Sequence, residues 1–113
     1  MENCLFCKIM NGEIPSSKVF ENDYVYAFRD INPQAAVHIL VIPRKHISSL
    51  NCTDQASDQE LAECLRAIRH IADQEGLKNG YRVVSNCGPD ACQSVPHLHF
   101  HILGGQQLNE KMS

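Results

Sequence analysis

The strongest alternation of apolar and polar positions in this sequence lies near its end, in HLHFHILGG at positions 97–105. Successive side chains of a β-strand point to opposite faces, so His97, His99 and His101 would share one face. The apolar residues between them would then face the core. We therefore predict a strand that begins at His97 and carries a row of imidazoles about 7 Å apart on one side.

Shorter patterns predict the other strands and a first helix. Apolar residues at helical spacing indicate a short helix up to about residue 11, where Gly12 and Pro15 follow. Aromatic and β-branched residues in 18–30 indicate two strands around a turn at 22–23. The apolar stretch 36–43 and the stretch 81–86 each predict one further strand.

One long helix is predicted over residues 57–75. Ser57, with Glu60 three positions later, has the spacing of a capping box, and Gly76 stands where a C-terminal cap belongs. The helical repeat that we expect to face the core consists of Leu61, Leu65, Ile68 and Ile71 or Ala72.

The order of these elements indicates the fold class. Strands before and after one long helix are typical of an α+β fold with a mostly antiparallel sheet, here in one domain of residues 1–113. A single long helix covers one face of a small sheet and leaves strand edges unpaired. We therefore expect the sheet to be extended by pairing between two copies, in a homodimer.

Composition and charge exclude several classes of protein. The chain is 43% hydrophobic and 20% charged, as in ordinary globular proteins. Its net charge is −3 and its lysines and arginines are scattered, which argues against a nucleic-acid partner. No apolar run suits a membrane helix or an export signal, so we expect no membrane partner and a reducing cytoplasmic location. There the six cysteines would not form a disulfide framework.

Two kinds of chemistry would use a row of three histidines. The row could hold a catalytic metal ion, or one imidazole could attack phosphorus while its neighbours supply charge and hydrogen bonds. The loop NCGPDACQSVP at 86–96 favours phosphate, because Asn86, Gln93 and Ser94 precede the row directly. The single histidines His38 and His70 are expected to be structural.

Two segments carry a family resemblance. QSVPHLHFHILGG at 93–105 resembles the signature of the histidine triad (HIT) nucleotide hydrolases and transferases, and AFRDINPQAAVHILVIPRKHI at 27–47 resembles their nucleotide-binding half. The similarity extends from about Cys4 to Gly105 and is closest to the Hint branch, the purine nucleoside phosphoramidases. Cys92 departs from the family pattern, since a glycine is usual at its position.

The resemblance implies a covalent mechanism without a catalytic cofactor. His99 would attack the α-phosphorus of a purine nucleoside 5′-phosphoramidate, or of a related nucleoside monophosphate derivative, and form a nucleotidyl-histidine. His97 and His101 would flank it, and Ser94 would bind the phosphate or the leaving group. Two alternatives stay open. One is a module that binds nucleoside monophosphates with little turnover, and the other is a metalloenzyme with the histidine row as ligands.

The resemblance also implies a nucleotide site. Asp30 would accept both ribose hydroxyls, because a carboxylate offers two acceptor oxygens. The nucleotide-binding residues expected in this way are Phe6, Phe28, Asp30, Ile31, Asn86, Gln93, Ser94, Val95, His99 and His101.

The pair Cys4 and Cys7, in CLFC, has the spacing of zinc ligands but lacks a second such pair. Some bacterial HIT proteins with this pair bind zinc with two additional histidines, which by position would be His46 and His97. The resemblance thus implies a structural Zn²⁺ on Cys4, Cys7, His46 and His97. His97 would then be a ligand rather than a participant in catalysis.

Overall fold

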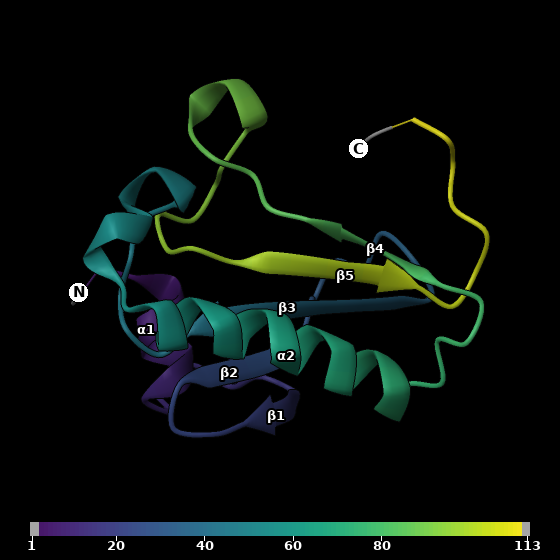
Figure 1. The fold of residues 1–113 in the computed structure, drawn as a ribbon, viewed down its shortest axis with the longest axis horizontal. Helices are drawn as coiled ribbons and strands as arrows, with labels where there is room; N and C mark the ends of the chain where they lie inside the picture. The colour runs from purple at the N-terminus through teal and green to yellow at the C-terminus, as the bar shows by residue number, and fades with distance from the viewer. Residues whose placement is uncertain (1–2, 112–113) are drawn as a thin grey trace.

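A computed structural model describes residues 3–111 as a five-stranded antiparallel sheet with a helix on each face (Figure 1). The strand order across the sheet is β1-β2-β3-β5-β4, which confirms the α+β prediction. No helix in this part of the chain is long and apolar enough to cross a membrane. In chain order the elements are α1 (Leu5–Met10), β1 (Lys18–Glu21), β2 (Val25–Arg29), β3 (Val37–Pro43), the 3-10 helix η1 (Leu50–Gln55), α2 (Asp58–Gln74), β4 (Tyr81–Val84), the 3-10 helix η2 (Pro89–Ala91) and β5 (Phe100–Gly104).

Helix α2 begins and ends where the sequence predicts. The amide of Glu60 donates to Ser57 Oγ at 3.0 Å and the amide of Ser57 donates to Glu60 Oε1 at 2.8 Å, which completes the capping box. At the other end Gly76 has φ +71°, and the amide of Leu77 donates to the carbonyl oxygen of Ala72. These bonds form a Schellman cap, which needs the left-handed backbone that glycine adopts freely.

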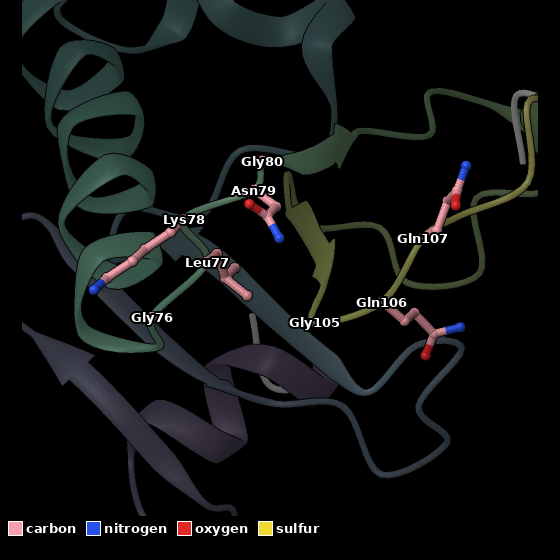
Figure 2. Close-up of a pocket in the computed structure, with 8 residues that line it drawn as sticks. All are labelled: Gly76, Leu77, Lys78, Asn79, Gly80, Gly105, Gln106 and Gln107. Carbon is pink, nitrogen blue, oxygen red and sulfur yellow. The ribbon is translucent and has the colours of Figure 1, made fainter.

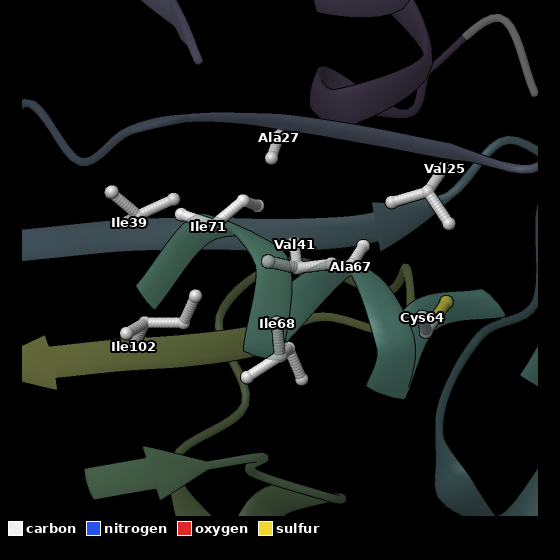
Figure 3. Packing of buried hydrophobic residues seen from close by; sticks show 9 residues of the cluster. All are labelled: Val25, Ala27, Ile39, Val41, Cys64, Ala67, Ile68, Ile71 and Ile102. Carbon is white, nitrogen blue, oxygen red and sulfur yellow. The ribbon is translucent and has the colours of Figure 1, made fainter. Parts of the chain in front are cut away.

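The buried face of α2 differs from the expected one. Leu65 is 60% exposed, and the face against the sheet is centred on small residues between the larger ones (Figure 3). Small side chains let the helix axis approach the sheet closely, whereas a leucine at their positions would hold it away. The side chains that pack together in this layer are Val25, Ala27, Ile39, Val41, Cys64, Ala67, Ile68, Ile71 and Ile102.

The opposite face of the sheet is covered by α1. Along β2 and β3 the alternate residues point to this side, so both faces of these strands are buried and their sequences are nearly all apolar. The side chains of this second layer are Cys4, Phe6, Ile9, Tyr26, Phe28, Leu40 and Ile42. Because the histidine row lies on the same side, α1 is the element that covers it.

Strand β5 begins at Phe100 rather than at His97, so the predicted start of the strand was wrong. The amide of His97 donates to the carbonyl oxygen of Val95 at 2.8 Å, and that of Leu98 donates to the carbonyl oxygen of Ile47 at 2.6 Å. These bonds hold residues 95–97 in a bend and keep residues 98 and 99 outside the strand ladder. The three imidazoles therefore point to different neighbours instead of forming one even row.

Candidate active site

A cavity of about 290 Å³ lies between α1, the segment that follows β2 and the histidines. Aromatic and apolar side chains form part of its lining, together with the imidazoles of His99 and His101 and serine hydroxyls. Eight of the ten expected nucleotide-binding residues line it: Phe6, Phe28, Asp30, Ile31, Ser94, Val95, His99 and His101. Asn86 and Gln93 are not among the residues that line it.

A larger cavity of about 790 Å³ lies elsewhere, between the end of α2 and the segment after β5 (Figure 2). It is lined by Gly76, Leu77, Lys78, Asn79, Gly80, Gly105, Gln106 and Gln107. Lys78 is the one ionisable group in that lining, and none of the expected site residues reaches it. The smaller cavity is therefore the candidate active site.

His99 presents a neutral nitrogen to this cavity. Its Nδ1 lies 2.7 Å from the carbonyl oxygen of His97, which can only accept, so Nδ1 carries the proton and Nε2 keeps its lone pair. The ring is 5% exposed and meets the edge of Phe6 at a centroid distance of 5.0 Å. Burial lowers the pKa of His99 below the usual value, since it disfavours the charged imidazolium. A neutral, oriented imidazole is a nucleophile at neutral pH.

A chain of hydrogen bonds fixes the opposite form of His101. The amide of Gln34 donates to His38 Nδ1 at 3.0 Å, so the proton of neutral His38 is on Nε2. That nitrogen lies 2.9 Å from His101 Nδ1 and donates to it. His101 must then carry its own proton on Nε2, where it is available as a donor. Burial, with the neighbouring His99 second, holds the pKa of His101 at about 4, so this arrangement stays neutral.

His38 thus belongs to the site, although it was expected to be only structural. It is 5% exposed, and its Nε2 also lies 3.4 Å from Asp30 Oδ2. The signal for this role is weak: His38 is the one polar residue of the apolar strand β3. Its partner His101 is 63 positions away in sequence, so only the register of β3 against β5 brings the two together.

The Asp30 carboxylate stabilises a turn after β2 and also lines the cavity. Its Oδ1 accepts a hydrogen bond from the amide of Asn32 at 2.8 Å, which closes a turn after β2. Its carboxylate lines the cavity beside Ile31, which is 89% exposed. An acidic group and an apolar side chain therefore stand together at this end of the site.

The side chain of Gln93 holds the loop 86–96 in place instead of lining the cavity, which differs from the expectation for this residue. Its Oε1 accepts from the amide of Gly88 at 2.9 Å, and its Nε2 donates to the carbonyl oxygens of Ser48 and Val95. The Gln93 amide is therefore occupied by the loop and does not face the cavity. Cys92 has φ +59°, a left-handed conformation that costs a side chain with Cβ about 1–2 kcal/mol.

His97 faces away from the cavity, toward the two N-terminal cysteines. Its Nδ1 lies 3.3 Å from Cys4 Sγ and 3.6 Å from Cys7 Sγ, and Cys7 Sγ is 3.5 Å from His46 Nδ1. The four ligand atoms all lie within 4.8 Å of one another. His97 Nε2 donates to the carbonyl oxygen of Pro43 at 3.0 Å, which leaves Nδ1 unprotonated toward the cysteines. Two sulfurs and two imidazole nitrogens fit a tetrahedral zinc site, and the outer hydrogen bond orients one ligand.

The histidine row does not converge on one metal ion. Within residues 3–111, His97 groups with Cys4, Cys7 and His46, and His101 groups with Asp30 and His38. No such group contains two members of the row. All six cysteines are free in the structure.

The sequence matches a known family over most of its length. The sequence model of the HIT domain aligns with residues 11–108. The chain belongs to the HIT family. One relative of this HIT protein is the 14 kDa zinc-binding protein of Zea mays, 49% identical over 107 residues that cover 93% of this chain and 84% of the relative. Another is adenylylsulfatase HINT1 of Arabidopsis thaliana, 48% identical over 93% of this chain and 73% of its own length.

Solved structures of HIT proteins share the whole architecture. A HIT family hydrolase from Clostridium thermocellum superposes with a TM-score of 0.94 at 41% identity, covering 100% of this chain and 99% of the other. A histidine triad protein from Clostridium difficile gives a TM-score of 0.90 at 46% identity, covering 99% and 98%. The N-terminal cysteine pair precedes the residues matched by the domain model, yet the superpositions include it.

Proposed function

We propose that this HIT protein hydrolyses nucleoside 5′-phosphoramidates, or related nucleoside monophosphate derivatives, through a covalent nucleotidyl-His99. The observation that carries this proposal is the pair of fixed tautomers at one cavity. His99 offers a lone pair at Nε2 and His101 offers an N–H at Nε2, while Phe6 and Phe28 line the same space. The hydrolase and adenylylsulfatase names of the relatives support a substrate with an adenylyl group.

The first step would form the bond between His99 Nε2 and the α-phosphorus as the bond from phosphorus to the leaving nitrogen breaks. The ring then carries a positive charge, which the carbonyl oxygen of His97 stabilises through its hydrogen bond from Nδ1. The N–H of His101 is placed to bond a phosphoryl oxygen. The leaving nitrogen takes up a proton from solvent water in the cavity as it departs. Ser94 and Ser16 both bring a hydroxyl to the cavity, and Ser94, beside the histidines in sequence, would bond the leaving nitrogen or the phosphate.

In the second step water would attack the phosphorus of the nucleotidyl-histidine. The bond to Nε2 breaks, its electron pair returns to the ring, and a nucleoside monophosphate leaves with one proton from the water released to solvent. Neutral imidazole is a good leaving group here because burial disfavours the cationic ring. A purine is favoured because Phe6 and Phe28, whose ring centroids are 5.5 Å apart, both line the cavity and offer aromatic contact area to a base.

We propose that Cys4, Cys7, His46 and His97 hold a structural Zn²⁺. The donor set and its close grouping support this assignment, as does the name of the Zea mays relative. The ion would supply a crosslink between α1, the segment after β3 and the bend before β5. No step of the hydrolysis needs it, so the chemistry rests on the chain's own imidazoles.

We also propose the homodimer expected from the sequence. Strand β4 is at an edge of the sheet, and its Tyr81 and Val83 are 40% and 41% exposed. An open edge with apolar side chains favours pairing with a second copy. The cytoplasmic location and the absence of nucleic-acid and membrane partners stay predictions.

The first test is hydrolysis of adenosine 5′-phosphoramidate with and without a strong chelator. Wild type, His99→Ala and the control His70→Ala would be compared, because His70 lies on α2 outside the cavity. We expect turnover that resists the chelator, persists in the control and disappears in His99→Ala. A denaturing quench at alkaline pH should trap adenosine monophosphate on the wild-type chain, because the P–N bond of a nucleotidyl-histidine is stable in alkali and labile in acid. Bound adenosine monophosphate without any turnover would instead indicate a binding module.

A further inference from the structure

We infer that metal binding at Cys4, Cys7, His46 and His97 is thermodynamically coupled to nucleotide binding through Phe6. The inference rests on the proposed function, because it needs both a nucleotide and a zinc ion. Phe6 lies between the two cysteines in the sequence CLFC, and its ring lines the candidate active site. The same single turn of helix thus supplies two metal ligands and one wall of the cavity.

The position of the Phe6 ring matters for the site. Its centroid is 5.0 Å from that of His99, 5.5 Å from that of Phe28 and 6.0 Å from that of His97, each in an edge-on arrangement. The ring is therefore packed between the nucleophile, the other aromatic wall and a metal ligand. A base that enters the cavity must contact Phe6, and a displaced Phe6 would leave one side of the base exposed to water.

Helix α1 has few bonds of its own to the sheet. It is six residues long, well below the length at which an isolated helix is stable. In the described chain the backbone hydrogen bonds of residues 4–14 all close within that segment. Packing of the apolar layer and the sulfur–imidazole contacts at 3.3–3.6 Å are what attach it.

Metal binding would replace those long contacts with bonds of roughly 2.0–2.3 Å from the ion to the sulfurs of both cysteines and to imidazole nitrogens of two histidines of the main fold. Cys4 caps α1 and Cys7 lies in its first turn, so the crosslink would order the turn that carries Phe6. A nucleotide base on Phe6 would order the same turn from the other side. Each ligand then lowers the ordering cost for the other, and linkage requires both affinities to rise by the same factor.

The test measures zinc affinity of the full-length protein by competition with a chromophoric chelator. It is run without ligand, with saturating adenosine monophosphate and with saturating ribose 5-phosphate. We expect adenosine monophosphate to raise zinc affinity about tenfold, within the usual range for coupled sites. Ribose 5-phosphate, which has no base to contact Phe6, should change it less than about twofold. Calorimetric titration of nucleotide into zinc-loaded and zinc-free protein should return the same factor.

Two variants show whether Phe6 carries the coupling. Phe6→Ala keeps all four metal ligands, and we expect its zinc affinity to become insensitive to adenosine monophosphate even at saturation. Phe20→Ala is the matched control, because Phe20 packs on the α2 side of the sheet, and it should keep the tenfold effect. If zinc only stabilised the whole fold, Phe6→Ala would keep the full coupling as well, which would overturn the inference.

The remaining outcomes separate this inference from the proposed function. Nucleotide that binds without changing zinc affinity in the wild type overturns the coupling and leaves the hydrolase proposal intact. Failure of adenosine monophosphate to bind either form overturns both the hydrolase proposal and the coupling. Failure of the chain to bind zinc overturns the metal site and the coupling, while phosphoramidate turnover would still support the covalent mechanism.

Discussion

Replacing His38 by leucine should slow phosphoramidate hydrolysis while leaving nucleotide affinity nearly unchanged. His38 has no direct place in the cavity lining, but its Nε2 donates to His101 Nδ1 at 2.9 Å and so holds the His101 proton on Nε2. Leucine has a similar volume and suits the apolar strand β3. It removes the donor without opening a large space.

The structure sets a lower and an upper limit for this effect. Loss of one buried hydrogen bond that orients His101 amounts to about 1.4 kcal/mol, or about tenfold in the fraction of productive tautomer and orientation. Complete loss of a donor to the developing phosphoryl charge costs about 100- to 1000-fold. His101 itself remains in the variant, so we expect kcat to fall about 10- to 100-fold with KM within about threefold.

The assay is steady-state hydrolysis of adenosine 5′-phosphoramidate by wild type, His38→Leu and His70→Leu. His70 is a single histidine on α2, outside both the cavity and the cysteine cluster, and its replacement should leave kcat unchanged. Circular dichroism must first show that His38→Leu is folded, since the change leaves the Gln34 amide without its acceptor. A kcat of His38→Leu within a factor of two of wild type would refute the relay through His38.

Three further predictions concern pH, the ribose and the braced loop. Burial holds the pKa of His101 at about 4 in the folded protein, below the ordinary value of 6.5, so the unfolded chain binds more protons at this residue between these values. This one residue should therefore lower the free energy of unfolding by about 1 kcal/mol from pH 7 to pH 5 after allowance for solvent screening, and urea titrations of His101→Gln should show a flatter pH slope. Asp30→Asn should reduce the ratio of the affinities for adenosine monophosphate and 2′-deoxyadenosine monophosphate, measured by calorimetry, by about tenfold. An unchanged affinity ratio would show that Asp30 does not bind the ribose hydroxyls. Cys92→Gly should relieve the left-handed strain and raise the free energy of unfolding by up to about 1 kcal/mol. An unchanged melting temperature in thermal unfolding would contradict this.

Local signals in the sequence predicted the ends of α2 and the succession of elements along the chain. Ser57 and Glu60 lie three positions apart and Gly76 follows the last turn, so each signal acts within one turn of backbone. The buried face of α2 was harder to predict. Hydrophobicity favours the larger Leu65, whereas the distance between helix and sheet favours the small Cys64 and Ala67, and that distance depends on the partner layer.

The sequence identified most residues whose side chains reach the cavity or the cysteine cluster directly. It missed His38, which reaches the cavity only through its hydrogen bond to His101. Cys4 and Cys7 do meet His46 and His97, as their resemblance to zinc-binding relatives implied. His38 was missed because its partner His101 lies on the neighbouring strand β5, 63 positions away in sequence. Gln93 was misassigned because a polar side chain in a phosphate loop can equally brace the loop, and only its bonds to three backbone groups distinguish the two roles.

The backbone decides which nitrogen each imidazole presents. The carbonyl oxygens of His97 and Pro43 and the amide of Gln34 fix the tautomers of His99, His97 and His38 in turn. These three groups belong to the main chain, so the two carbonyl oxygens are present whatever the side chains are, and the amide at position 34 is present in any residue except proline. A pattern of residue types can therefore identify the imidazoles that take part, but the fold determines whether each one attacks, donates or binds a metal. His97, His99 and His101 present different nitrogens to their neighbours because different backbone groups orient them, directly for His97 and His99 and through His38 for His101.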